Sequence, residues 1–297
     1  MSKEATFYRV KPFSDWARFL KQAKPLLLER EVESNLTWEV GRVSADQAGL
    51  TRPWSAWLVL DGKKPVLSAL PSVTEYLILS AGHPGACAAL ADFLSAKSHS
   101  LKGVSGPEPV SEVFADAWIE QSGKVSNLCA SLSLYLASAD PKFASEVAGG
   151  MRLARVDEGD KLRGWAIDFV ADSAHPMDPR VVARLSENMM GRRDLFVWEA
   201  SGEVVAMGGF GRETPNGLVV NMVYTPRNRR GRGYAGALTS GLVCEANARG
   251  KRFCCLYSDF SSSVRENLYE RIGFQRMGDF AERSFTDQSL SEPSDRQ

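Results

Sequence analysis

Hydrophobic residues recur along this chain in two kinds of pattern. A spacing of three to four residues predicts helices, whereas short apolar runs bounded by turn residues predict strands. In the first half, residues 1–50 are expected to be helical, and helices are predicted at residues 13–28, 87–97 and 110–121. Strands are predicted at residues 57–60, 66–70, 76–79 and 128–136, with a turn at residues 103–107. Asp61-Gly62, between the first two strands, is a dipeptide favoured in tight hairpin turns.

The second half follows a similar order of elements. Strands are predicted at residues 151–156, 195–198, 204–210, 218–224, 253–257, 274–277 and 281–285. Helices are predicted at residues 162–170, 179–190, 235–248 and 264–272, with Asp157 as the N-cap of the first. Because the two halves share almost no residue identity, the pattern alone leaves open whether the chain contains an internal duplication.

A stretch rich in turn residues separates the two halves. Residues 140–150 contain Pro141, Gly149 and Gly150 and are expected to form a linker. The expected domains are therefore residues 1–145 and residues 146–286. Residues 287–297 are polar and are expected to form a flexible tail.

The overall composition narrows the class of protein. The chain has 297 residues, of which 44% are apolar and 24% are charged, as is typical of soluble globular proteins. Its 36 Lys and Arg residues balance 36 Asp and Glu residues, so its net charge does not favour nucleic-acid binding. No apolar run approaches the roughly 20 residues of a membrane helix. The charged residues 1–10 do not resemble a secretory signal.

The five cysteines are not spaced like the ligands of a metal site, so no metal is expected. Free and buried thiols are expected instead, which favours a reducing compartment and hence the cytoplasm. The five residues are Cys87, Cys129, Cys244, Cys254 and Cys255.

The segment with the clearest chemistry follows the apolar strand at residues 218–224. Arg230-Gly231-Arg232-Gly233-Tyr234-Ala235 forms a glycine-rich turn that leads directly into a predicted helix. Backbone N–H groups at a helix start lack partners, and the helix dipole adds partial positive charge, so the turn can hold a pyrophosphate. Glycines allow the phosphates to come close to the backbone.

Charged side chains around this turn support the same interpretation. Arg227, Arg229, Arg230 and Arg232 can neutralise phosphate oxygens. The alternative is a solvated basic turn without a ligand. The sequence matches neither G-x-x-x-x-G-K-[ST] nor G-x-G-x-x-G, which argues against a mononucleotide loop or a Rossmann dinucleotide site.

Two segments resemble the GNAT superfamily of N-acetyltransferases. The turn is similar to motif A of that superfamily, [QR]-x-x-G-x-[GA], which Arg230, Gly233 and Ala235 satisfy. Residues 267–274, Asn-Leu-Tyr-Glu-Arg-Ile-Gly-Phe, are similar to a second element of the superfamily. The resemblance covers residues 150–286. Within the superfamily the chain is most similar to predicted bacterial acetyltransferases related to glycine N-acyltransferase.

This resemblance implies an α/β (α+β) fold with a central mixed, mostly antiparallel sheet flanked by helices, in two GNAT-like halves in tandem. Relatives carry a poorly matched N-terminal half, and residues 103–107 leading into the helix at 110–121 resemble theirs. The first half has His83-Pro84-Gly85-Ala86 where the glycine-arginine loop would stand, so it is expected to be degenerate and to bind no coenzyme.

The resemblance also implies an activity and the residues that carry it. The chain would be an acyltransferase that moves an acyl group from acetyl-CoA to a primary amine, expected to be that of a small molecule, with Tyr269 as general acid. No metal is implied. The implied coenzyme contacts are Met222, Val223, Tyr224, Arg230, Gly231, Arg232, Gly233, Tyr234, Ala235, Gly236 and Ser262.

The general base is less defined, because relatives place a glutamate on the strand at residues 218–224, where this chain has Asn221 and Tyr224. Asp259 is the substitute candidate, and Ser258 acting through water is another. Relatives often have an Asn in place of Ser262. His175 lies near the acceptor-binding segment of the family.

Other functions stay open at this point. The chain could acetylate protein amines, or it could sense acetyl-CoA without turnover. Nucleic-acid binding through residues 227–232 is disfavoured, because aromatic residues for base stacking are not interleaved with the arginines. The expected oligomeric state is a monomer or a homodimer.

Overall fold

The computed structural model describes residues 7–46, 55–72, 74–137, 147–173, 178–259 and 268–287. Its contacts divide the chain into two units. Unit 1 comprises Met1–Ser131 and Asp279–Gln297, and unit 2 comprises Leu132–Gly278. The strand order is β1-β2-β3-β4-β5-β12-β6-β11-β10-β9-β8-β7.

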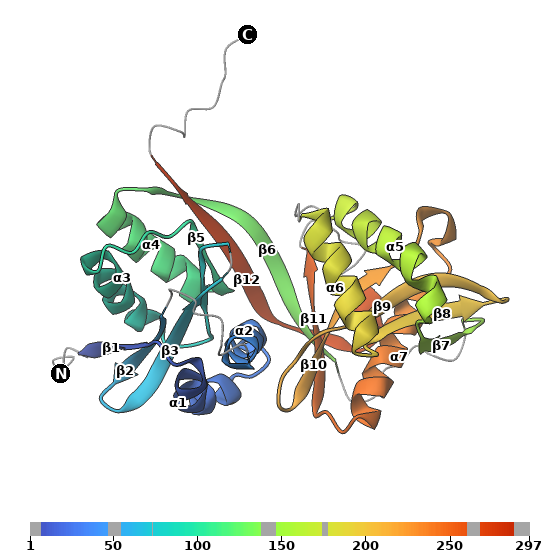
Figure 1. Ribbon diagram of the computed structural model, residues 1–297, viewed down its shortest axis with the longest axis horizontal. Helices are drawn as coiled ribbons and strands as arrows, with labels where there is room; N and C mark the ends of the chain where they lie inside the picture. The colour runs from blue at the N-terminus through green and yellow to red at the C-terminus, as the bar shows by residue number, and fades with distance from the viewer. Residues whose placement is uncertain are drawn as a thin grey trace, which may run out of the picture. The chain divides into compact units, whose positions relative to one another are not determined.

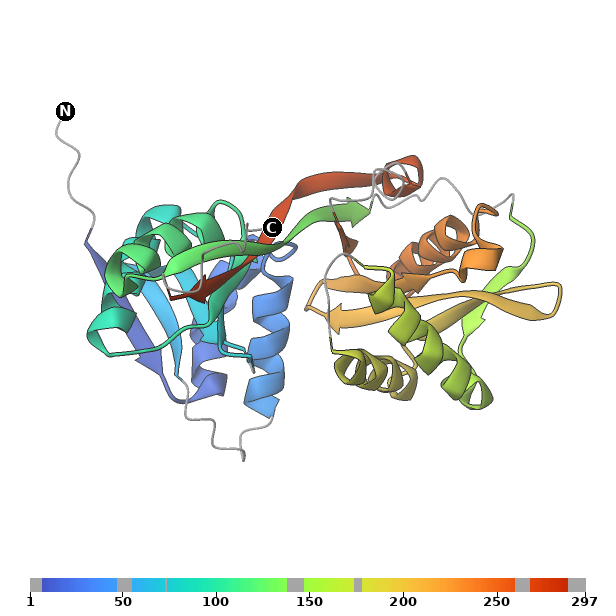
Figure 2. The ribbon, with the colours of Figure 1, turned by 90° about the horizontal axis from the view of Figure 1, so that it is seen from above.

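The first half of the chain forms an α/β arrangement that begins with a strand. Its elements are β1 (Tyr8–Phe13), α1 (Trp16–Glu29), α2 (Asn35–Asp46), β2 (Ala56–Asp61), β3 (Lys64–Pro71), β4 (Tyr76–Leu79), η1 (Pro84–Ala86), α3 (Cys87–Ala96), β5 (Gly103–Pro107), α4 (Val110–Ser122) and β6 (Val125–Ala137). One apolar cluster packs α1 and α2 on the strands, and another packs α3 and α4 on them. The two helix pairs lie on opposite faces of the strands (Figures 1 and 2).

The second half repeats this order. Its elements are β7 (Gly150–Leu153), η2 (Val156–Glu158), α5 (Gly159–Ala171), α6 (Pro179–Gly191), β8 (Leu195–Ala200), β9 (Glu203–Glu213), β10 (Gly217–Tyr224), η3 (Arg227–Arg229), α7 (Tyr234–Ala248), β11 (Phe253–Asp259) and β12 (Phe274–Thr286). Helices α5 and α6 cover one face of the strands and α7 covers the other (Figure 1). The predicted mixed, mostly antiparallel sheet flanked by helices is confirmed.

Two long strands each contribute to both units. Residues 132–136 of β6 lie antiparallel to β11 in unit 2. Residues 280–284 of β12 lie antiparallel to β5 in unit 1. Each unit therefore includes a strand from the other half of the sequence, and the division by contacts does not follow the expected boundary at residues 145/146.

Four sequence-based expectations about local structure are wrong. Residues 8–13 form a strand because they pair with β2, a contact that helical spacing does not reveal. Residues 103–107 form a buried strand rather than a turn. Residues 274–286 form one strand rather than two. Asp157 does not cap a helix, because it lies within the 3-10 turn η2.

The glycines of β5 explain why a turn-like composition forms a strand. A Cβ at Gly103 would lie 2.2 Å from the ring of Tyr76, and one at Gly106 would lie 3.0 Å from Cβ of Leu79. Glycine is therefore required by close strand packing at these positions, and not by a turn.

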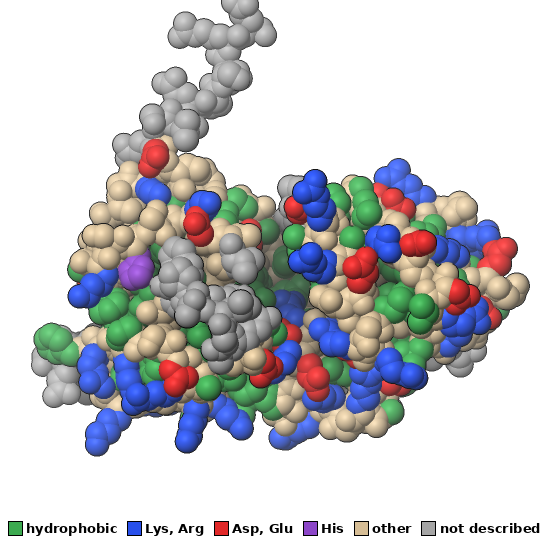
Figure 3. All heavy atoms as spheres, in the orientation of Figure 1, with side chains coloured by type: hydrophobic (Ala, Val, Ile, Leu, Met, Phe, Trp, Pro, Cys, Tyr) green, Lys and Arg blue, Asp and Glu red, His purple; other side chains and the backbone are tan. Residues whose placement is uncertain are grey.

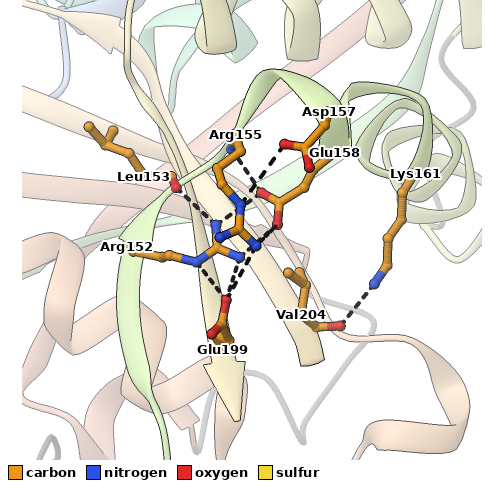
Figure 4. Close-up of polar contacts among 8 residues, drawn as sticks. All are labelled: Arg152, Leu153, Arg155, Asp157, Glu158, Lys161, Glu199 and Val204. Carbon is orange, nitrogen blue, oxygen red and sulfur yellow. Dashed lines mark hydrogen bonds and ion pairs between the residues drawn. The ribbon is translucent and has the colours of Figure 1, made fainter. Parts of the chain in front are cut away.

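An ionic cluster connects the elements around β7 in unit 2 (Figure 4). Arg152 of β7 donates to Glu158 at 2.6 Å and pairs with Glu199 of β8 at 2.5 Å. The amide of Arg155 donates to Glu158 at 2.8 Å. Hydrogen bonds from Arg152 lower the pKa of Glu158 to about 2. The cluster therefore links β7, β8 and the turn before α5.

Surface charge, helix length and cysteine exposure can be compared with three further expectations from the sequence. Figure 3 shows cationic and anionic side chains intermixed over α5 and α6. None of the helices in the described ranges is long and apolar enough to cross a membrane. All five cysteines are free, but Cys129 and Cys244 are exposed, so burial of all five is wrong.

Candidate coenzyme and acceptor site

The site begins at an irregularity in β10. Leu218 and Val220 pack with α7, whereas Met222 and Tyr224 pack with α5 and α6. An unbroken strand would keep all four on one face. A register shift against β9 between Asn221 and Tyr224 reverses the alternation, and Met222 has φ 56°. This bulge turns the side chains at the end of the strand to the opposite face. Bulges near functional sites often redirect side chains in this way.

The bulge coincides with the point where β10 parts from β11. The parallel ladder joins residues 217–220 to residues 253–256. β11 then continues along β6 as far as the Asp259–Leu132 pair. Within the described chain, the main chain of residues 221–224 has no ladder partner in β11. The two strands diverge here and leave main-chain groups on the β11 side of β10 to which an amide chain could bind.

The glycine-rich turn has the backbone geometry that its sequence predicts. Gly231 and Gly233 have φ 77° and φ 81°, in the left-handed region that favours glycine. Helix α7 begins at Tyr234, one residue earlier than predicted, and the amide of Ala237 donates to the carbonyl of Gly233 at 3.0 Å. The amides of residues 231–236 have no hydrogen-bond partner among the described residues. They form an unpaired run at the positive end of a helix.

Three of the four loop arginines are paired with carboxylates. Arg227 and Arg230 each donate to Asp172 at 2.5 Å, and Arg229 pairs with Glu203. Hydrogen bonds from Arg227 and then Arg230 lower the pKa of Asp172. Arg232 is exposed and has no ion-pair partner in the part of the chain that the structure describes.

Asp172 is a site residue that sequence reasoning missed. It is the C-cap of α5 and is separated by 55 and 58 residues from its two arginine partners. No local signal marks such a pair, because only the packing of α5 beside β10 brings the residues together. Asp172 occupies the guanidinium groups that phosphates would use.

The two predicted catalytic residues lie on different faces of the strands. Tyr269 is 8% exposed and packs with α7, with ring centroids 6.0 Å from Tyr135 and 5.9 Å from Phe274. Asp259 ends β11, is 8% exposed and alternates with Ser258, which places it on the face opposite α7. Ser258 Oγ is buried and has no hydrogen-bond partner among the described residues. Asp259 thus ends the strand that diverges from β10, whereas Tyr269 packs in the cluster under α7.

Two predicted residues lie outside the described ranges, namely Ser262 and His175. Residues 268–271 of the predicted helix at 264–272 are helical, and the segment 264–267 is also outside the described ranges. Among the described residues, no group of His, Cys, Asp and Glu could hold a metal ion.

The corresponding region of unit 1 lacks these features. A Cβ at Gly106 of β5 would lie 3.1 Å from the carbonyl oxygen of Leu79, so β4 and β5 stay close where β10 and β11 diverge. At the equivalent turn, the hydroxyl of Tyr8 and Nδ1 of His83 are hydrogen-bonded at 3.0 Å. A cavity of about 390 Å³ between α2 and β4 is lined by no Lys or Arg, and Glu39 and Glu282 are its charged residues. The close strands, the hydrogen-bonded turn and the acidic cavity lining do not favour binding of a polyphosphate.

Comparison with known proteins identifies the fold. Residues 191–276 match the acetyltransferase (GNAT) domain family. No curated protein sequence is significantly similar to the chain.

Several solved structures resemble the whole chain. A GNAT-family acetyltransferase from Colwellia psychrerythraea has a TM-score of 0.59 and 14% identity, over 93% of this chain and 98% of that chain. A GCN5-related N-acetyltransferase from Sphaerobacter thermophilus has a TM-score of 0.56 and 16% identity, over 94% and 95%. A tandem GNAT protein from the clavulanic acid biosynthesis pathway has a TM-score of 0.51 and 11% identity, over 97% and 100%.

At these identities the similarity establishes the fold, and the match to a tandem protein supports an arrangement of two GNAT halves. Together with the family match to residues 191–276, it shows that this chain has a GNAT-type fold and carries a GNAT acetyltransferase domain in unit 2.

Proposed function

We propose that unit 2 transfers an acyl group from acetyl-CoA to the primary amine of a small molecule. The observation that carries this proposal is the run of amides at residues 231–236, which have no partner among the described residues, together with the end of β10. The main chain of residues 221–224 pairs with β9 but has no ladder partner in β11 within the described chain. The first feature suits a pyrophosphate, and the second suits the amide groups of a pantetheine arm. The nearer relation to glycine N-acyltransferase and a cytoplasmic location are parts of the same proposal.

The coenzyme would be held mainly by backbone groups. The amides of residues 231–236 would bind phosphate oxygens, with Arg230 and Arg232 adding charge. The main-chain groups of Met222, Val223 and Tyr224 would bind the arm. When bound, acetyl-CoA supplies an activated acyl carbon and a thiolate leaving group.

Asp172 must lose hydrogen bonds to Arg227 or Arg230 when phosphates approach these arginines. A carboxylate and a phosphate both accept hydrogen bonds from guanidinium groups, and they repel each other at close range. We propose that phosphate replaces Asp172 on at least one of these arginines. The intrinsic affinity for coenzyme is therefore reduced by this competition.

Two side chains would move protons. The attacking amine must be neutral, and the carboxylate of Asp259 would accept a proton from it. The hydroxyl of Tyr269 would donate its proton to the leaving sulfur. An oxyanion would be stabilised by a backbone N–H of residues 222–224.

Unit 1 would bind no coenzyme. Its β4 and β5 do not diverge, its turn has no arginine, and its cavity has acidic rather than basic lining. We propose that it acts as a structural half whose sheet is completed by β12.

Replacement of Gly233 by Glu tests the coenzyme site. The variant adds a side chain and a negative charge to the run of unpaired amides, so acetyl-CoA binding and turnover should both be lost. Gly202→Glu is a matched control, because Gly202 has φ 76°, similar to the 81° of Gly233, but lies in the β8–β9 turn with nothing within 4 Å of its added Cβ. Equal coenzyme affinity in the two folded variants would refute the site.

An amine panel with purified protein tests the transfer. Acetyl-CoA-dependent acylation of a small amine supports the proposal. Binding of acetyl-CoA without turnover on any small amine would favour a sensor, and acylation of protein amines alone would favour a protein acetyltransferase.

A further inference from the structure

The cavity of unit 1 has no part in the proposed acyl transfer. All of its lining residues belong to unit 1, so the cavity lies within a single unit. Its volume of about 390 Å³ falls in the range of ordinary small-molecule sites. At roughly 30 Å³ for each non-hydrogen atom, such a space holds a ligand of about a dozen atoms.

Three neighbouring strands form the floor of this cavity. Tyr76 and Ile78 come from β4, Ser105 from β5 and Glu282 from β12. In the ladders Ile78 lies opposite Ser105, and Ser105 lies opposite Glu282, so these side chains share one face. Ile78 packs with residues of α1 and α2, which identifies this face as the one that the two helices cover.

Helix α2 forms the wall of the cavity. Leu36, Glu39, Val40 and Val43 line it, together with Ser44. Their spacing of three or four residues places them on one side of the helix. Most of this wall is therefore apolar and suits the hydrocarbon part of a ligand.

Two serine hydroxyls at the cavity are buried without a hydrogen bond. Ser44 is 5% exposed and Ser105 is 4% exposed, and within the described chain neither hydroxyl has a hydrogen-bond partner. Ser72 differs from them, because its hydroxyl accepts from the amides of Thr74 at 3.2 Å and Tyr76 at 3.0 Å. A buried hydroxyl without a partner costs free energy, and a ligand with a polar group at this place offsets that cost.

The charged side chains that line the cavity are acidic. They are Glu39 and Glu282. The carboxylate of Glu39 accepts two hydrogen bonds from Arg42, at 3.0 and 2.8 Å. Arg42 also pairs with Asp46 at 3.0 Å, so on α2 one cation is shared by two carboxylates. The lining therefore attracts positive charge and repels negative charge.

Tyr76 adds an aromatic ring close to one of these carboxylates. Burial raises the pKa of its phenol to about 12, and the charges of Cys129 and Glu282 add to the shift. The phenol is therefore neutral at neutral pH. An aromatic ring and a carboxylate both attract a cation, so their proximity favours a ligand with a positive group.

We propose that unit 1 binds at this cavity an organic cation with N–H donors, such as an amidine, a guanidine or an amine. Its N–H groups donate to the carboxylate of Glu282 and to the hydroxyl of Ser105, and its hydrocarbon part lies against α2. The cation is bound and not acylated, because the glycine-arginine turn lies in unit 2. The site is therefore separate from the proposed acyl transfer and does not depend on it.

The test uses three probes of the same size and shape that differ in charge. Benzamidine is a cation, benzamide is neutral and benzoate is an anion, and none of them is an amine that could be acylated in unit 2. In calorimetry with the full chain, benzamidine should bind about 10-fold more tightly than benzamide, because it makes charge-assisted hydrogen bonds. Benzoate should show no binding.

Two variants of the cavity separate charge from space. Glu282→Gln should remove the preference for benzamidine over benzamide. Val43→Phe places a ring in the cavity and should weaken binding of both probes. Glu120→Gln is the matched control, because Glu120 is an exposed residue of α4 in the same unit, and it should bind benzamidine as the wild type does.

Hydrogen exchange locates the ligand and verifies the fold of each variant. Benzamidine should protect amides of α2 and β4 and leave those of α5 and β10 unchanged, in the wild type and equally in Gly233→Glu. Without ligand, unchanged exchange of β5 and α4 shows that unit 1 of a variant is folded. No binding of benzamidine, equal affinity for benzamide or benzoate, protection confined to unit 2, or affinities unaffected by both cavity variants would overturn the proposal.

Discussion

The C-terminal strand should stabilise the N-terminal unit, and Phe285→Ala tests this directly. Phe285 of β12 is 6% exposed and belongs to the cluster beneath α3 and α4, with its ring centroid 6.3 Å from that of Trp118. Its amide donates to the carbonyl of Lys102 at 2.8 Å. Truncation of a buried phenylalanine to alanine costs about 3–5 kcal/mol. That is a large part of the roughly 5–15 kcal/mol of a typical domain.

Hydrogen exchange with peptide resolution is the appropriate assay. Where exchange requires opening of the unit, a loss of about 3–5 kcal/mol raises the opening constant by roughly 100- to 1000-fold or more. Amides of β5 and α4 should therefore lose protection, whereas those of β8 and β9 should keep it. Met277→Ala is the matched control, since Met277 lies on the same strand but is 44% exposed. Unchanged protection of β5, or a loss confined to β8 and β9, would refute the reasoning.

Three other variants test separate parts of the account. Folding lowers the pKa of Glu158 from 4.5 to about 2, so its carboxylate stabilises the fold above pH 4.5, and this contribution is lost as the pH falls toward 2. Urea unfolding should accordingly show Glu158→Gln less stable by about 3 kcal/mol at pH 7 and by only about 2 kcal/mol at pH 3.5, and a difference that does not change with pH would be contrary evidence. Asp172→Asn should bind acetyl-CoA about 3- to 10-fold more tightly by calorimetry, because it frees Arg227 and Arg230; weaker binding would mean that Asp172 positions these arginines rather than competing for them. Tyr269→Phe should lower kcat by about 100-fold while the coenzyme Kd stays similar, and an unchanged kcat would exclude the general-acid role.

Local patterns in the sequence predict most helices and the coenzyme turn. Helical spacing gives α3, α4 and α6 within a residue or two, and the glycines at 231 and 233 adopt the backbone angles that their turn requires. These features depend on neighbours in sequence. The similar order of elements in the two halves also follows from such local patterns.

Features that depend on distant residues are not visible in the sequence. β1 is a strand because it pairs with β2, and β5 is a strand because Gly103 and Gly106 pack against β4. The exchange of β6 and β12 places a residue such as Phe285 in the core of unit 1. Asp172 becomes a candidate site residue only when packing shows that it pairs with Arg227 and Arg230.

The central claim is that the chain has one coenzyme site, formed by the glycine-arginine turn of unit 2. Isothermal titration of the full chain with acetyl-CoA measures this directly. The account predicts one molecule bound per chain in the wild type and none in Gly233→Glu. Two molecules bound per chain, or one still bound in folded Gly233→Glu, would contradict it.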